Sequence, residues 1–192
     1  MKAALLFSIA TMLPSGAMAM DFPADRIVAA ATGDWNRDGR TDLVVIAAPG
    51  EGEDEDNGVY IYLADPNESR LKPKVAAPNK LWGSLAMFGQ EPAVAALPNG
   101  SIQLTSQNSA VGRDRWSQNL TLAWRNAQFV VAGYRYASRD TLAPGNSTDC
   151  DLNVLTGKGM ANGKPIAVPA VQIAFEGWDD EIGRKACGLA SR

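Results

Sequence analysis

The 192-residue sequence contains no histidine and only two cysteines. Without histidine there is no Ser-His-Asp or Cys-His catalytic group, and no imidazole ligand for a metal. The chain also lacks a G-x-S-x-G nucleophile motif and a glycine-rich phosphate loop. A carboxylate pair acting on a glycoside stays open, because any two of the 21 acidic residues can serve. The composition therefore favours a protein that is not an enzyme.

Long apolar runs are also absent after the N-terminus. The chain starts with Lys2 and the segment AALLFSIATML, which is too short to span a bilayer as a helix. The helix-breaking Pro14-Ser15-Gly16 follows, and Ala17-Met18-Ala19 has the A-x-A pattern of a signal-peptidase site. We predict a signal peptide at residues 1–19, with an N-terminal core helix as the alternative. The mature protein would then be periplasmic or secreted and would have no membrane span.

Neither sign of charge dominates the chain. It has 18 Lys and Arg against 21 Asp and Glu, and removing Lys2 with the signal leaves 17 − 21 = −4. No basic stripe is present, so nucleic acid is not expected as a partner. The mature length of 192 − 19 = 173 residues is enough for one complete core. We predict a single domain over residues 20–192, with an alternative boundary near residues 66–80, where Pro and Lys are dense.

The two cysteines, Cys150 and Cys187, form an even pair in a chain predicted to be exported. Such a pair most simply forms a disulfide, which would tie the C-terminal tail to the body. Two free buried thiols are the alternative.

Turn-forming residues recur about every ten positions, with short apolar or alternating runs between them. This pattern predicts a mostly β fold of antiparallel strands and hairpins in a single small domain. Strands are expected at 43–48, 58–64 and 170–175, and hairpins around 98–101, within 119–138 and around 162–163. Residues 53–58 and 65–74 have the composition of loops, and no segment after the signal shows a helical period.

The stretch GDWNRDGRTDLVVIAA, residues 33–48, places oxygen-bearing side chains at alternate positions before an apolar run. Calcium needs six to eight oxygen ligands in a flexible shell. Gly39 permits the sharp reversal that such a loop requires. An EF-hand is excluded, because Val45 stands where its closing Glu would be. The predicted ligands are the side chains of Asp34, Asn36, Asp38 and Asp42 and the backbone carbonyl of Arg40. An Asx-rich turn without an ion is the alternative.

Both flanks of this loop look like strands, and a strand–loop–strand with its closing acid at position 9 resembles the FG-GAP or VCBS type of repeat. The resemblance covers about sixteen residues and implies a calcium site between adjacent strands of a β-propeller blade. A propeller needs several blades, however, and the sequence has one such loop.

A wider resemblance joins this loop to RWSQNLTLAWRNAQFVVAGYRY and NVLTGKGMANGK, in that order. Together they resemble exported bacterial proteins of unknown function that have an N-terminal GDxNxDGxxD loop and a C-terminal N-x-LTGK segment. The resemblance implies fold and export but brings no activity.

Aromatic and arginine side chains gather in the predicted hairpin at 119–138 and just before it. Mixtures of Trp, Tyr and Arg are typical of protein interfaces, although on a hairpin they also serve as core or cross-strand pairs. The candidate partner surface comprises Trp116, Trp124, Tyr134 and Tyr136, accompanied by Arg113, Arg115, Arg125, Arg135 and Arg139.

The sequence as a whole predicts an exported, calcium-stabilised binding protein of the cell envelope, with an envelope protein or a glycan as partner. An inhibitor or immunity protein against a cell-wall hydrolase is the first alternative, and a carboxylate-based glycoside hydrolase is the second. Two acidic runs, residues 51–56 and 178–181, are further cation candidates, but such runs are usually solvated.

Overall fold

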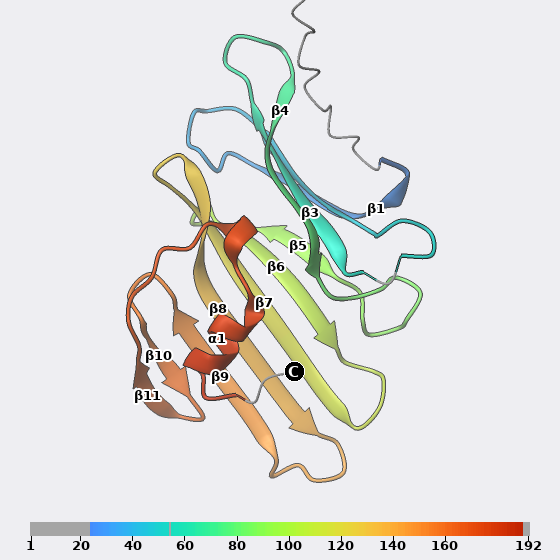
Figure 1. The fold of residues 1–192 in the computed structure, drawn as a ribbon, viewed down its shortest axis with the longest axis vertical. Coiled ribbons are helices and arrows are strands. Elements are labelled where there is room, and N and C mark those ends of the chain that lie inside the picture. The colour runs from blue at the N-terminus through green and yellow to red at the C-terminus, as the bar shows by residue number, and fades with distance from the viewer. Residues whose placement is uncertain (1–23, 54, 190–192) are drawn as a thin grey trace, which may run out of the picture.

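The computed structural model describes residues 24–53 and 55–189, so the predicted signal peptide lies outside the described residues. Within them the chain forms two antiparallel sheets, one above the other in Figure 1, which confirms the mostly β fold. After the short 3-10 helix η1 (Ala24–Arg26), the four-stranded sheet has the order β1-β2-β3-β4, and the seven-stranded sheet has the order β11-β10-β9-β8-β7-β6-β5. The strands of the first sheet are β1 (Ile27–Gly33), β2 (Asp42–Ala47), β3 (Asn57–Ala64) and β4 (Leu71–Leu81). Those of the second are β5 (Ala93–Ala96), β6 (Ile102–Asn108), β7 (Asp114–Arg125), β8 (Gln128–Asp140), β9 (Ser147–Asn153), β10 (Lys158–Ala161) and β11 (Lys164–Ala167).

The hairpins form where the turn residues predicted them. Asn162 and Gly163 join β10 to β11 with φ of 49° and 74°, the left-handed pair that a tight hairpin requires. Asn126 and Ala127 join β7 to β8 with φ of 50° and 58°. The β7–β8 hairpin is longer than predicted, because its strands extend to Asp114 and Asp140.

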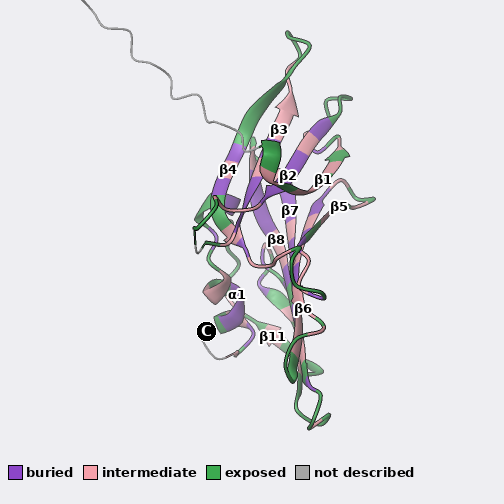
Figure 2. Ribbon diagram, turned by 90° about the vertical axis from the view of Figure 1, so that its right-hand side faces the viewer, coloured by how far each residue is buried: buried purple, intermediate pink, exposed green. Residues whose placement is uncertain are grey.

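One hydrophobic core joins the two sheets. Val44, Ile46, Val59 and Ile61 of the first sheet belong to the same buried cluster as Ile102, Leu104, Leu120 and Leu122 of the second. Figure 2 shows buried stretches on β4 and β7 and within the C-terminal helix. A shared core makes the two sheets parts of a single domain. The alternative boundary near 66–80 would cut a hairpin, because β4 pairs with β3 from Leu71 to Leu81.

Strand β4 corrects the expectation that residues 65–74 are all loop. Its early part carries Lys72, Pro73 and Lys74, a composition that disfavours a strand. Proline is tolerated at Pro73 because β4 is an edge strand of its sheet, where one side of the backbone needs no partner. Later in β4, Val75 and Ala77 are buried and attach the strand to the core.

The C-terminal segment also differs from expectation. Residues 170–175 do not form a strand; Ala174 makes an isolated bridge to Val130, and the 3-10 helix η2 (Phe175–Gly177) follows. The segment is held to the first sheet by Lys80 of β4, whose ammonium group donates hydrogen bonds to the carbonyls of Glu176 and Trp178. Burial lowers the pKa of Lys80, and nearby acidic side chains, Asp180 first, oppose that shift.

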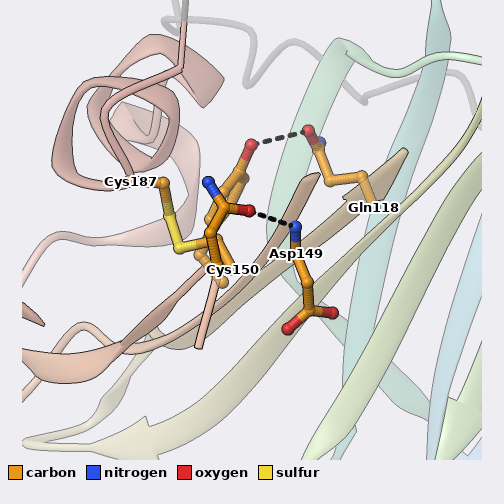
Figure 3. The surroundings of a disulfide bond; sticks show 6 residues. Gln118, Asp149, Cys150 and Cys187 are labelled. Atoms are coloured by element: carbon orange, nitrogen blue, oxygen red, sulfur yellow. Dashed lines mark hydrogen bonds between the residues drawn. A yellow bond between two sulfur atoms is a disulfide. The ribbon is translucent and has the colours of Figure 1, made fainter. Parts of the chain in front are cut away.

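A short helix, α1 (Asp180–Ala186), then lies against one face of the seven-stranded sheet (Figure 1). The Asp179 side chain caps it by accepting the Glu181 N–H at 2.9 Å. Gly183 permits close packing, because a Cβ there would lie 2.5 Å from the Tyr134 ring. The predicted disulfide is confirmed: Cys187, directly after α1, is bonded to Cys150 of β9 across 37 residues (Figure 3). None of the helices among residues 24–53 and 55–189 has the length and apolarity needed to cross a membrane.

Candidate metal loop

The candidate loop, residues 34–41, joins β1 to β2 at the edge of the four-stranded sheet. Arg37 and Gly39 have φ of 62° and 83°, and these two left-handed residues reverse the chain within a few positions. Packing requires glycine at position 33, because a Cβ there would lie 2.8 Å from the Trp35 ring. Trp35 is only 2% exposed and belongs to the core cluster, so its side chain attaches the loop to the hydrophobic core.

Three of the predicted ligand side chains form one hydrogen-bonded group at the surface. The Asp34 carboxylate accepts the N–H groups of Asp38 at 3.0 Å and Gly39 at 2.9 Å. The Asn36 amide donates to Asp38 Oδ2 at 3.0 Å, while Asp38 Oδ1 accepts the Arg40 N–H at 2.9 Å. The structure therefore brings Asp34, Asn36 and Asp38 together around the backbone of the loop.

Asp42 occupies a different environment, at the start of β2 and fully buried. Its Oδ2 accepts the Trp35 N–H and its Oδ1 accepts the Ala64 N–H, both at 3.0 Å, so it links the loop to the end of β3. Burial raises the pKa of the Asp42 carboxyl; the N–H groups of Ala64 and Trp35 oppose this, and the charge of Asp38 adds to it. None of the described Lys and Arg side chains forms an ion pair with Asp42.

The loop fits calcium in the chemistry of its donors. Three carboxylates, one amide and the Arg40 carbonyl are all hard oxygen ligands, and an oxygen that accepts one N–H keeps a lone pair for a cation. The carboxylates do not form a metal cluster by themselves: within the described part of the chain, no three acidic or cysteine side chains are grouped so that they could hold a metal ion. The neutral oxygens of Asn36 and Arg40 would have to complete any shell.

Comparison with known proteins points to the same segment. Residues 28–62 match the FG-GAP repeat family. The match runs from β1 through the loop and β2 to Tyr62 in β3, so it covers a minor part of the chain. Four antiparallel strands in sequence order, as in β1–β4, are also the arrangement of one propeller blade. Searches of curated proteins and of solved structures returned no match.

The candidate partner surface needs a correction, because the structure does not place its four aromatic rings on one open face. Tyr134 is 1% exposed and Tyr136 is 8% exposed, whereas Trp116 and Trp124 are half-buried. The physical reason is strand register: Tyr134 lies directly opposite the buried Leu120, on the face that α1 covers. Tyr134 and Tyr136 are therefore core residues and are wrong as surface candidates.

The two acidic runs serve local structure in the described residues. Glu53 accepts the Gly50 N–H, and position 54 lies outside the described residues. In the second run, Asp179 caps α1, and Asp180 accepts hydrogen bonds from Gln118 at 2.5 Å and from the Trp178 indole at 2.9 Å. The sequence signal for α1 was this Asp-Asp-Glu run, which favours a helix start.

Proposed function

We propose that this protein is an exported β-domain of the cell envelope that is stabilised by calcium and acts by binding a partner. The observation that carries the proposal is the candidate loop, residues 34–41, which lies inside the FG-GAP match. The loop is followed by Asp42, a fully buried carboxylate that forms no ion pair with any Lys or Arg in the described part of the chain. FG-GAP repeats suggest a β-domain interaction module, and the absence of histidine supports a role without catalysis.

Calcium would be held by the side-chain oxygens of Asp34, Asn36, Asp38 and Asp42 and by the Arg40 carbonyl. Bound there, it would supply positive charge near Asp42 and Asp38, and so offset the repulsion by which the charge of Asp38 helps to raise the pKa of Asp42. Because Asp42 also bonds Ala64 of β3, fixing its carboxylate would fix the register of β1, β2 and β3 together. The proposed role of the ion is therefore structural.

Export is supported by the sequence of residues 1–19 and by the Cys150–Cys187 disulfide, since disulfides persist in oxidising compartments. Trp116 and Trp124 remain the aromatic candidates for the partner surface. Trp116 lies against Trp82, with ring centroids 5.0 Å apart, and Trp124 lies against Phe129 at the same separation. Both rings are thus held in place while part of each stays accessible.

The binding role is tested by capture of envelope proteins and glycans on the immobilised mature chain, once with calcium and once with a chelator. Capture should return a partner that binds saturably in calcium and is lost in chelator. Its binding should be weakened by Trp116→Ala or Trp124→Ala. Turnover of a polysaccharide, abolished by a single Asp or Glu substitution, would contradict the binding role.

Export is tested separately, by expressing the full-length protein with its N-terminus. The protein should be recovered outside the cytoplasm, cut after Ala19. Cytoplasmic retention of the uncut chain would contradict export.

A further inference from the structure

The seven-stranded sheet has a second face, opposite the face that α1 covers. Along β6, β7 and β8, successive side chains alternate between the core and this second face, which carries polar side chains. Leu120 and Tyr134 point toward the core, so their neighbours at odd spacing point to the other face. Near one end of these strands this face is hollowed into a cleft of about 290 Å³. The residues that line it include Gln107, Ser109, Arg115, Ser117, Ala137 and Arg139.

Two arginines line this cleft, and neither forms an ion pair with a carboxylate of the described residues. Arg115 of β7 lies directly opposite Arg139 of β8 in the antiparallel register, a position where like charges destabilise a sheet. Nη1 of Arg115 is buried and has no hydrogen-bond partner among the described residues. A buried, unpaired guanidinium nitrogen is unfavourable, because it loses water without gaining an acceptor.

Neighbouring arginines are satisfied differently. Arg113 forms a salt bridge with Asp140, and Arg135 lies 3.8 Å from a carboxylate oxygen of Asp149. Neither Arg115 nor Arg139 forms a salt bridge in the part of the chain that the structure describes. The deficit of negative charge is thus local to the cleft, although the chain as a whole has a net charge of −3.

We propose that this cleft binds a small oxyanion ligand through Arg115 and Arg139. The planar guanidinium fork matches a carboxylate or a phosphate group with two parallel hydrogen bonds, and an anion between the two arginines would relieve their repulsion. The hydroxyl groups of Ser109 and Ser117 and the Gln107 amide would bind further polar atoms of the ligand. The volume is at the lower limit for ligand pockets, which favours a small organic acid or a phosphate ester. This site is independent of the calcium loop and does not rest on it.

Binding is tested by titrating inorganic phosphate and glucuronate into the mature protein at constant ionic strength, with chloride as the reference anion, by NMR of backbone amides. The expected result is saturable shifts at residues 107–117 and 137–139 with at least one probe. Arg115→Gln should weaken that binding at least tenfold. Arg135→Gln is the matched control. Arg135 lies on β8, the strand of Arg139, but its guanidinium group is close to Asp149. This variant loses the same charge and should change the affinity for the probe less than twofold. Phosphate binding alone would assign a phosphate ester, and glucuronate binding alone would assign a carboxylate.

Thermal melting distinguishes a ligand-binding role of Arg115 from a purely structural one. In chloride alone, Arg115→Gln should melt no lower than wild type, because it removes a guanidinium group whose buried Nη1 has no hydrogen-bond partner among the described residues. It should also lose the shift in midpoint that the bound probe gives. If this variant fails to fold, Arg139→Gln, at an exposed position, must show the loss of binding instead. The proposal is overturned if neither probe binds better than chloride, or if the variants at 115 and 135 weaken binding equally.

Discussion

Replacing Asp42 by alanine should destabilise the fold even when calcium is absent. The side chain is fully buried and accepts two backbone N–H groups, those of Trp35 and Ala64, each at 3.0 Å. Hydrogen bonds to a charged group contribute about 1.5–3 kcal/mol each, and the substitution leaves two buried donors unpaired. The cost of burying the carboxylate, which shows in its raised pKa, offsets part of this. We expect the free energy of unfolding to fall by about 2–4 kcal/mol.

The assay is thermal and urea unfolding of the mature chain in chelator, compared with Asp42→Asn and Asp38→Ala. A loss of this size lowers the midpoint of a domain of this length by roughly 5–15 °C. Asp42→Asn keeps one acceptor oxygen and should lose about half as much. Asp38→Ala removes an acceptor at an exposed site and should cost less than about 1 kcal/mol. Hydrogen exchange should show lost protection at the Ala64 amide. An Asp42→Ala midpoint within 2 °C of wild type, with Ala64 still protected, would show that the Asp42 carboxylate does not stabilise the end of β3.

Three further changes have expected outcomes. Gly33→Ala should destabilise the protein by about 1–3 kcal/mol and alter tryptophan fluorescence, because the new Cβ would lie 2.8 Å from the Trp35 ring; unchanged melting would show that this ring shifts freely. Replacing Cys150 and Cys187 by serine should cost roughly 3–4 kcal/mol for a 37-residue loop, measured by urea unfolding, and an unchanged midpoint would contradict a stabilising bridge. Arg113 lowers the pKa of Asp140, so the stability that this pair adds is present above about pH 4 and is lost as pH falls through the lowered pKa. Asp140→Asn should therefore be less stable than wild type at pH 7, and the difference should shrink in acid; a gap that stays constant down to pH 2 would contradict the assignment.

Local patterns predicted most of the sheets, because turn chemistry and buried runs act over a few residues. Asn162-Gly163 forms its hairpin, and the apolar run after the loop forms β2. Strand β4 was missed, because only its place at the edge of the sheet makes Pro73 acceptable. Helix α1 has seven residues, too few to show a helical period, and is held by its cap and by the disulfide.

The site was predictable only in part, for a similar reason. The spacing of Asp34, Asn36 and Asp38 indicated which side chains gather in the loop, and the structure groups them. It did not indicate that Asp42 would be buried and shared with β3, because that depends on the pairing of β2 with β3. Burial of Tyr134 likewise depends on register: it lies opposite Leu120, beneath a helix that the sequence pattern did not indicate.

Calcium binding by the candidate loop with Asp42, and its coupling to folding, is tested by melting the mature protein in 10 mM calcium and in chelator. Asp38→Ala is melted beside it, and magnesium at the same concentration controls for ionic strength. With a Kd of about 10⁻⁴ M, as in extracellular modules, calcium would add about 2.7 kcal/mol and raise the wild-type midpoint by roughly 5–10 °C. The variant should show no rise. Identical midpoints for wild type in calcium and chelator, with no heat of binding in a calorimetric titration, would contradict the claim and leave the loop as an Asx-rich turn.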